Sequence, residues 1–460
     1  MSARSMFCWL LGLLLAWGTA CAQAELAWQR SLHPSYAEAI ESVARAQAAA
    51  VTPAERDEAA RRALEVQALY GRHAELAALL RELSERPGLA DERLLYQARL
   101  DMLAGRHAEG ARLLEPLRRK FVRLPEGPLR RELRLTLATL DLHLGQPEDA
   151  TRELNRIVDA AREAGDLELA ARAFSALGAV QLEMFDYAAG LAYYQQALRL
   201  APSWALQTRE RARMGMAQMH HMLGNRREAF ALLDTALAAF HRSQNLRAEA
   251  DALLLRGFFL SRDGQVQAAL EPYRQALALR EQLGGDADIV NALTHLCGTL
   301  SDARLLSEAL SLCERATRMA EATDSQSLRW DAYWVSAEVQ AAAGDFRLAY
   351  EHQQRATRAL QKHARLNLVN MTGAMRERFD TDRQRQEVER LSAQLEDAQA
   401  MRAQWQRMAA VLGLLAVALA GVVAWRWPRR GLAAEPGAQA GVHAGAQAST
   451  QASLNSASAL

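Results

Sequence analysis

The sequence predicts an all-α protein built from stacked antiparallel helix pairs. The 460 residues are half hydrophobic and only 6% aromatic. Alanine, leucine, arginine, glutamate and glutamine dominate, and all of them favour helix. Strand-forming residues never cluster into the alternating runs that a half-buried strand needs. The segment Gly-Arg-His-Ala-Glu begins at Gly71 and again at Gly105, which indicates an internal repeat.

A glycine-containing turn of this kind recurs along the chain, with further copies at Gly145, Gly224, Gly264 and Gly344. A small or apolar residue follows each glycine after five positions. A larger residue follows four positions after that one, and another apolar residue three positions later still. These offsets put one stripe on one face of the helix after the turn. Small residues in the stripe allow close packing on the preceding helix. One such pair cannot bury both faces, so the pairs must stack.

The spacing resembles the tetratricopeptide repeat (TPR), and one unit carries most of the family pattern: Phe174, Leu177, Gly178, Tyr187, Gly190, Tyr194, Ala197, Leu198 and Pro202. The resemblance covers residues 57–363 and implies a right-handed solenoid of about eight helix pairs, after an N-terminal capping region over residues 25–56. Units are expected to begin near Asp57, Asp91, Arg131, Ala171, Glu210, Ala250, Val290 and Trp330. Most steps between these starts exceed the usual length of the family's repeat, so we expect longer helices.

Residues 1–24 are predicted to be a secretory signal peptide. Arg4 precedes a short apolar run, and Ala22-Gln23-Ala24 matches a cleavage site. Acylation of Cys21, as in a lipoprotein, is the alternative. An exported chain is expected to place its solenoid in the bacterial periplasm.

A second apolar stretch, residues 408–425, contains no charged residue and is long enough to span a bilayer. Arg426 follows at once, as is typical of the cytoplasmic end of a span. We therefore expect a single-pass inner-membrane protein with a disordered cytoplasmic tail over residues 426–460. A buried core helix is the alternative interpretation of this stretch.

Residues 364–407 are predicted to form one charged stalk helix that leads to the membrane span. Val388, Leu391, Leu395 and Ala398 follow the spacing of a short coiled coil. This spacing predicts a homodimer through the stalk, although Arg402 would weaken the seam. A monomeric solvated spacer is the alternative.

The chain lacks the motifs that carry catalysis or bind cofactors. No H-E-x-x-H, G-x-S-x-G or P-loop pattern occurs, so we expect no catalytic residue, metal or cofactor. The stretch Gly284-Gly285-Asp286-Ala287-Asp288 is interpreted as a turn and helix cap between repeats. A formal net charge of +1 gives no indication of a nucleic-acid partner.

Cys297 and Cys313 fall on facing sides of one predicted helix pair. We expect their Cα atoms to lie within disulfide range, below about 7 Å. Two buried thiols and a disulfide both remain open, although an oxidising compartment would allow the bond.

The TPR resemblance implies a binding face on the concave side, lined by the first helix of each pair. Phe258 and Trp334 are the candidate aromatic anchors for a protein or peptide ligand. Packing between repeats is the alternative role for these positions. The lysines and asparagines of the family's chaperone-tail clamp are absent. The candidate residues are Arg172, Arg211, Met214, Gln218, Asp251, Leu254, Phe258, Asn291, Asp331, Trp334 and Glu338.

The order of signal peptide, solenoid, stalk and span resembles the periplasmic TPR sensory region of bacterial membrane diguanylate cyclases and histidine kinases. In those families a catalytic domain follows the span, whereas here only residues 428–460 follow Trp427. We therefore expect no enzyme activity, but protein–protein interaction that serves sensing or signalling through a partner chain. A scaffold or assembly factor for cell-envelope machinery is the alternative.

Overall fold

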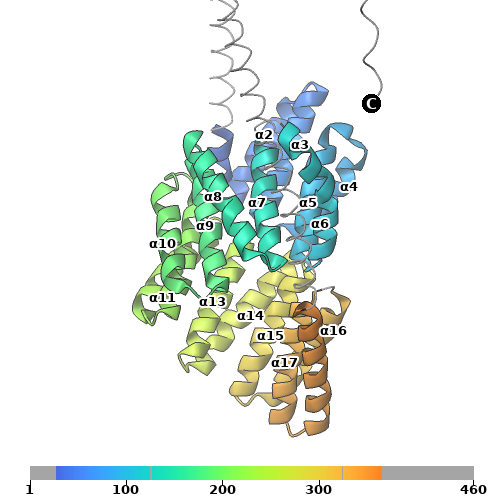
Figure 1. Ribbon diagram of the computed structural model, residues 1–460, viewed down its shortest axis with the longest axis vertical. Helices are drawn as coiled ribbons and strands as arrows, with labels where there is room; N and C mark the ends of the chain where they lie inside the picture. The colour runs from blue at the N-terminus through green and yellow to red at the C-terminus, as the bar shows by residue number, and fades with distance from the viewer. Residues whose placement is uncertain (1–26, 125–126, 324, 365–460) are drawn as a thin grey trace, which may run out of the picture. The chain divides into compact units, whose positions relative to one another are not determined.

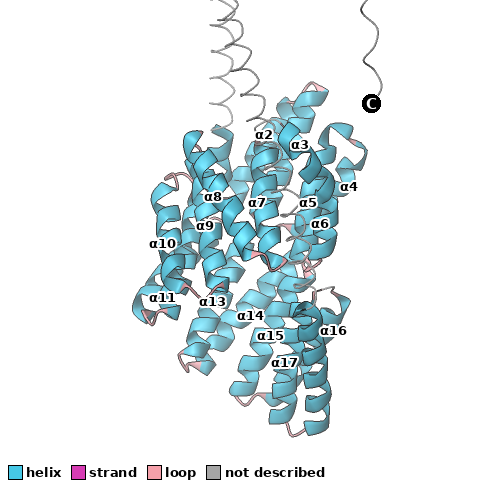
Figure 2. Cartoon of the chain, in the orientation of Figure 1, coloured by secondary structure: helices cyan, strands magenta, loops and turns pink. Residues whose placement is uncertain are grey.

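The described part of the protein is entirely helical. The computed structural model describes residues 27–124, 127–323 and 325–364. Figure 2 shows only helices and loops over these ranges. A short helix over residues 27–32 and α2 (Tyr36–Ala49) come first, where the sequence predicted a capping region.

Within the described ranges, eight antiparallel helix pairs follow one another along the chain (Figure 1). Short 3₁₀ turns, η1 (Leu83–Glu85), η2 (Pro87–Leu89) and η3 (Phe121–Arg123), occur near the second and third pairs. The predictions of an all-α fold and of repeated helix pairs are confirmed. The pairs are α3 (Pro53–Leu69) with α4 (His73–Glu82), α5 (Ala90–Leu103) with α6 (His107–Lys120), α7 (Pro128–His143) with α8 (Pro147–Glu163), α9 (Leu167–Glu183) with α10 (Tyr187–Leu200), α11 (Leu206–Met222) with α12 (Arg226–Arg242), α13 (Leu246–Arg262) with α14 (Val266–Leu283), α15 (Asp286–Asp302) with α16 (Leu306–Ala322), and α17 (Gln326–Ala342) with a helix over residues 346–364.

The long repeat step has a simple structural origin. From α11 onward, helices of mostly 17 residues alternate with short turns, so the helix starts are evenly spaced. The unit starts expected from the TPR pattern fall about one helical turn inside the first helix. α9 begins at Leu167, four residues before Ala171, and α13 begins at Leu246, four before Ala250. The additional residues thus lengthen the helices, as the long step predicted.

Each tight turn ends a helix with one residue in the left-handed region. The Gly145 amide donates to Leu142 O, and the Gln146 amide donates to Asp141 O at 2.9 Å. This pair of hydrogen bonds is the Schellman pattern. Glycine fills this position in most turns, but Phe185, Gln244 and Arg304 occupy it with φ between 58° and 63°. The turns at Phe185 and Arg304 therefore lack the glycine that indicates the other turns in the sequence.

Replacing Phe185 with glycine is expected to stabilise the fold by about 0.5–1 kcal/mol. A side chain in the left-handed region is strained, and glycine removes the strain at some cost in unfolded-chain entropy. Phe185 is 76% exposed, so little packing is lost. Thermal unfolding of the full chain measures the effect. Gly224→Ala, at φ +85° with open space around it, is expected to shift stability by a similar amount in the opposite direction.

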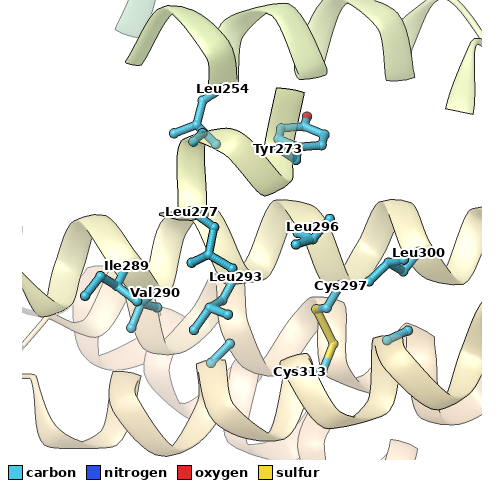
Figure 3. Close-up of a cluster of buried hydrophobic side chains, with 14 of the residues drawn as sticks. Leu254, Tyr273, Leu277, Ile289, Val290, Leu293, Leu296, Cys297, Leu300 and Cys313 are labelled. Atoms are coloured by element: carbon cyan, nitrogen blue, oxygen red, sulfur yellow. A yellow bond between two sulfur atoms is a disulfide. The ribbon is translucent and has the colours of Figure 1, made fainter. Parts of the chain in front are cut away.

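Cys297 of α15 and Cys313 of α16 are joined by a disulfide across one helix pair (Figure 3). Their Cα atoms lie 5.5 Å apart, inside the range that a disulfide needs. Figure 3 shows the bond beside Leu296 and Leu300, which extend from the same helix as Cys297. Both cysteines are at most 1% exposed within this apolar cluster.

Reducing this disulfide is expected to lower the free energy of unfolding by about 3 kcal/mol, because the bond closes a short loop in the unfolded chain. The sequence separation is 16 residues. Urea unfolding of the purified, oxidised protein, with and without reductant, measures the loss. The Cys297→Ala/Cys313→Ala double variant serves as the control and should not respond to reductant. Mass spectrometry that finds two free thiols in the protein purified without reductant would contradict the prediction.

The helices over residues 27–364 are together called the repeat unit below. Within it, helices far apart in the sequence meet. The Tyr36 amide donates to Ser243 O at 2.9 Å, and Gln207 Nε2 donates to His33 O at 3.2 Å. His73 Nδ1 lies 3.1 Å from Gly284 O, and the Arg247 guanidinium donates to His73 Nε2 at 3.2 Å. Because a carbonyl only accepts and a guanidinium only donates, His73 is the neutral Nδ1–H tautomer. These contacts place α2, the loop before it and the start of α4 against α11, α13 and the ends of α12 and α14.

Several sequence predictions lie outside the described residues: the signal peptide over residues 1–24, the stalk over 364–407 apart from its first residue, the coiled-coil seam within it, the apolar stretch over 408–425 and the tail over 426–460. Within the ranges that are described, no helix is both long and apolar enough to cross a membrane.

Candidate functional site

The interior of the repeat unit is lined by the first helices of successive pairs. A cavity of about 230 Å³ lies among the helix over residues 27–32, its following loop, and helices α3, α5, α7, α9 and α11. Polar and charged side chains from these segments face one another. They are Gln29, His33, Glu65, Arg99, Glu132, Glu168, Arg172, Ser175, Gln207, Thr208 and Arg211.

Glu132 of α7 is the centre of one charged cluster. It accepts a hydrogen bond from Arg99 of α5 at 2.9 Å and two from Arg172 of α9 at 2.5 and 3.0 Å. Burial alone would raise the pKa of Glu132, but the charge and hydrogen bonds of Arg172 and the charge of Arg99 lower it to about 2. Glu132 is therefore ionised and bridges three successive first helices.

Glu168 extends this cluster to α11. Its carboxylate accepts a hydrogen bond from the Thr208 hydroxyl at 2.8 Å and lies 3.8 Å from Arg172. Burial raises the pKa of Glu168 despite the opposing charge of Arg172. The contact with Thr208 therefore links the first helix α9 to the next first helix, α11.

Arg280 of α14 is the centre of a second cluster. It donates to Asp251 at 2.9 Å, to Asn291 at 3.2 Å and to the backbone oxygen of Asp288 at 2.6 Å. Burial acts to raise the pKa of Asp251, but the charges of Arg280 and Arg247 outweigh it and lower that pKa. The Arg247 guanidinium itself lies 3.9 Å from the Asp288 carboxylate.

Arg211 of α11 lies between the two clusters without a partner of its own. Among the described residues, no hydrogen-bond acceptor or carboxylate lies within bonding distance of its guanidinium. Burial and the nearby charge of Arg247 lower the pKa of Arg211 to about 10, while Asp251 opposes this shift. It remains a cation at neutral pH, in an interior that already holds other cations.

A second cavity, of about 350 Å³, opens beside Arg211. Arg99, Arg172, Arg211 and Arg247 all line it, and Glu132 is the one carboxylate among the described residues of its lining. A third cavity, of about 1020 Å³, shares Gln29, Glu65, Glu132, Glu168 and Arg172 with the first. Because they share lining residues, the three cavities adjoin one another. The second and third cavities have about the size of small-ligand sites, and the first is somewhat smaller.

The structure brings four of the sequence-derived candidates into this interior. Arg172 lines all three cavities and Arg211 lines two of them, while Asp251 and Asn291 belong to the neighbouring Arg280 cluster. Leu254 is 8% exposed and packs in the hydrophobic core.

Phe258 and Trp334, the candidate anchors, differ in exposure. Phe258 is half-buried, beside Phe259 and beneath the Arg262 guanidinium at 5.7 Å. Trp334 is 43% exposed and lies 6.4 Å from Trp330. Neither lines the three cavities.

The remaining candidates also lie away from these cavities. Met214 packs against the core around Phe259, Gln218 is half-buried, and Glu338 is exposed. Asp331 is half-buried, and burial raises its pKa to about 6.

Arg99, Glu132, Glu168 and Arg247 are interior residues that the sequence reasoning did not select. Glu132 stands at the second position of the unit expected near Arg131, so the same register, applied to that earlier unit, contained it. Glu168 and Arg247 lie in the extra first turn of α9 and α13, before the expected unit starts. The longer helices place additional charges on the interior face.

The chemistry of the interior suits recognition through charge and hydrogen bonding. Its polar groups include guanidinium, carboxylate, hydroxyl and imidazole groups. In the described ranges, no three histidine, cysteine or acidic side chains are grouped so as to hold a metal ion.

Helix pairs, Schellman turns and the packing of second-helix tyrosines, Tyr194 and Tyr273, on first-helix glycines define a TPR-like repeat protein. No family model matches the chain, and no curated protein matches it. Solved structures that are similar in fold include the following three. One is BtubC (BKLC) from P. vanneervenii, at 17% identity and TM-score 0.41, over 47% of this chain and 91% of that one. The second is a Rap protein complexed with competence and sporulation factor, at 14% identity and TM-score 0.45, over 68% of this chain and 99% of that one. The third is the APC/C hetero-tetramer Cut9-Hcn1, at 11% identity and TM-score 0.48, over 72% of this chain and 58% of that one.

Proposed function

We propose that the repeat unit binds a peptide or an extended segment of a partner protein in its charged interior, and that it catalyses no reaction. The observation that supports this proposal is the set of three adjoining cavities lined by first helices. An extended ligand offers a row of backbone and side-chain groups, and the interior offers a matching row of guanidinium and hydroxyl groups. Such a groove recognises its ligand through a few anchoring contacts.

Buried polar atoms without a partner among the described residues support a ligand in the same place. His33 is 3% exposed and lines the 230 Å³ cavity, and no described residue forms a hydrogen bond with its Nδ1. The Ser175 hydroxyl lines the same cavity and also lacks a partner within the described ranges. Buried polar groups are usually satisfied, so groups left open around a cavity favour an additional binding partner.

A peptide-binding test can be directed at this cavity. Peptides selected from a random display library on the purified full-length chain provide the ligands. Ser175→Phe would fill the 230 Å³ cavity, whereas Gln353→Phe adds the same side chain at an exposed position of the last helix. We expect selected peptides to bind the wild type and Gln353→Phe, and to bind Ser175→Phe at least ten-fold more weakly. Equal binding to all three, or no selected peptide, would contradict the proposal.

The proposed cellular setting is a single-pass inner-membrane protein with its repeats in the periplasm, acting in sensing through a partner chain. The Ala22-Gln23-Ala24 site and the apolar stretch over residues 408–425 support this setting. Protease protection in spheroplasts tests it. We expect added protease to digest residues 27–364 in spheroplasts and not in intact cells. Full protection of these residues in spheroplasts would rule out a periplasmic solenoid.

A scaffold for cell-envelope machinery is the second candidate function, and exposed aromatics on the last helix pair favour it. Trp334 is 43% exposed, Phe346 72% and Tyr350 65%. Aromatic residues of this kind are common anchors at protein interfaces. Crosslinking at Tyr350 in cells distinguishes the two functions. Capture of secretion or outer-envelope components favours the scaffold, and capture of a membrane kinase or cyclase favours sensing.

A further inference from the structure

We propose that the cavity among Arg99, Arg172, Arg211 and Arg247, of about 350 Å³, binds a ligand carboxylate that adjoins an apolar group. This inference rests on the proposed peptide-binding function and names the chemistry that one of its subsites recognises. It assigns Arg211 as the residue that meets the carboxylate. The cavity is formed by α3, α4, α5, α7, α9, α11 and α13.

The charges that line this cavity do not balance. Four arginines face it with a single carboxylate among the described residues, Glu132, whose oxygens are already occupied by Arg99 and Arg172. Within the described ranges Arg211 has no ion pair, and Arg247 pairs only with the more distant Asp288 at 3.9 Å. Asp251 is held by Arg280. An anion in the cavity would therefore supply the charge that Arg211 and Arg247 lack.

The histidines that line the cavity do not change this balance at neutral pH. Burial, followed by the charge of Arg247, lowers the pKa of His73, and burial lowers the pKa of His143. Both are neutral, and both nitrogens of His73 are already engaged by Gly284 O and Arg247. The excess positive charge thus belongs to the arginines.

A carboxylate suits these arginines better than an isolated point charge would. A guanidinium presents two parallel N–H groups that match the two oxygens of a carboxylate. Because Arg211 pairs with no other described residue, it is available for such a pair. Exposed fractions of 28% for the Arg99 side chain and 21% for that of Arg247 leave the cavity open to solvent.

The remaining lining of the cavity is largely apolar. Leu76, Met102, Leu103 and Leu135 lie in the same lining as the four arginines. Leu76 and Leu135 are at most 8% exposed, whereas Met102 and Leu103 are half-buried. A ligand with an aliphatic group next to its carboxylate would satisfy both kinds of lining at once. The carboxyl terminus of a peptide that ends in an aliphatic residue has this chemistry, and so does an acidic side chain next to one.

Small probes can test the subsite by calorimetric titration of the purified full-length chain. N-acetyl-leucine carries a terminal carboxylate, and N-acetyl-glutamic acid α-amide carries a side-chain carboxylate. N-acetyl-leucinamide has the shape of the first without its charge, and inorganic phosphate is an anion without an apolar group. We expect at least one carboxylate probe to bind at least ten-fold more tightly than the leucinamide and phosphate. The stronger of the two carboxylates identifies the source of the group in a natural ligand.

Variants separate binding at Arg211 from general effects on folding. Arg211→Gln removes a cation that has no partner among the described residues, so thermal stability should be retained or raised while carboxylate binding falls at least ten-fold. Arg112→Gln is the control, because the Arg112 side chain is 79% exposed on α6 and should leave binding unchanged. Equal binding by Arg211→Gln and wild type would overturn the inference. So would binding of the amide or of phosphate as tightly as the carboxylates, or no carboxylate binding.

The failure of this inference can be told apart from failure of peptide binding as such. If display-selected peptides bind the wild type and Arg211→Gln equally, the carboxylate subsite is refuted and the peptide-binding function stands. If no peptide is selected but N-acetyl-leucine binds through Arg211, the subsite stands and the peptide-binding function is refuted.

Discussion

Replacing Glu132 with glutamine is expected to destabilise the full chain by about 3–5 kcal/mol, because breaking a buried ion pair leaves charges uncompensated. Glu132 accepts three hydrogen bonds from Arg99 and Arg172, and its side chain is 12% exposed. Glutamine keeps the shape but places an uncharged amide between two guanidinium groups. Urea unfolding of the purified chain measures the difference.

Glu153→Gln is the matched control for this substitution. Glu153 pairs with Arg156 at 3.2 Å on the surface of α8, with exposed fractions of 31% and 58%. Surface pairs within one helix contribute a few tenths of a kcal/mol. The control should therefore unfold within about 0.5 kcal/mol of the wild type. A loss at Glu132 no larger than the loss at Glu153 would show that the interior cluster is solvated like the surface.

The same substitution should change how stability depends on pH. The folded pKa of Glu132 is lowered from 4.5 to about 2, so its ionised form stabilises the fold above pH 4.5. That contribution is lost as the pH falls from about 4.5 towards about 2, because the unfolded chain takes up the proton first. Glu132→Gln should therefore lose less stability than the wild type across this window. Parallel stability curves for the two proteins would contradict the low pKa.

The repeat architecture was predictable from the sequence because its signals are local. A turn residue and a small residue five positions later, such as Ala269 after Gly264 or Ala229 after Gly224, lie within one helix pair. Both alanines are fully buried where the two helices cross. The long repeat step also follows from local helix lengths. The turn at Phe185 was missed because a non-glycine residue occupies the left-handed position there.

The interior was only partly predictable because its contacts join residues far apart in the sequence. Arg172 and Arg211 were found from their repeat positions, but their surroundings depend on where later helices meet earlier ones. His73 meets Arg247 and Gly284, which follow it by 174 and 211 residues. No periodicity within one unit contains that information. Trp334 was selected for its position and proved exposed, whereas Leu254 in the same register is buried in the core.

Replacing Tyr194 with alanine is expected to cost about 3–5 kcal/mol, the range for deleting a buried aromatic side chain. Tyr194 of α10 is 7% exposed, and its ring fills the space between Gly178 of α9 and Gly215 of α11. It therefore joins one helix pair to the first helix of the next. Tyr193→Ala is the control, because Tyr193 is only half-buried on the same helix and should cost less. Equal losses at both positions would argue against the packing of the Tyr194 ring between α9 and α11.

A double-mutant cycle that combines Tyr194→Ala with Gly215→Ala shows whether the Tyr194 ring packs directly on the backbone at Gly215. A Cβ atom at Gly215 would lie 2.3 Å from the Tyr194 ring, and the opposite ring edge would lie 2.7 Å from a Cβ at Gly178. The ring cannot move away from one helix without striking the other, so Gly215→Ala alone should destabilise by about 1–3 kcal/mol through overpacking. In the Tyr194→Ala background the added methyl enters a cavity instead. There Gly215→Ala should be neutral or stabilising, since alanine also favours helix by about 1 kcal/mol. Thermal unfolding of the four proteins gives the coupling energy, and simple additivity of the two losses would rule out direct packing of the ring on α11.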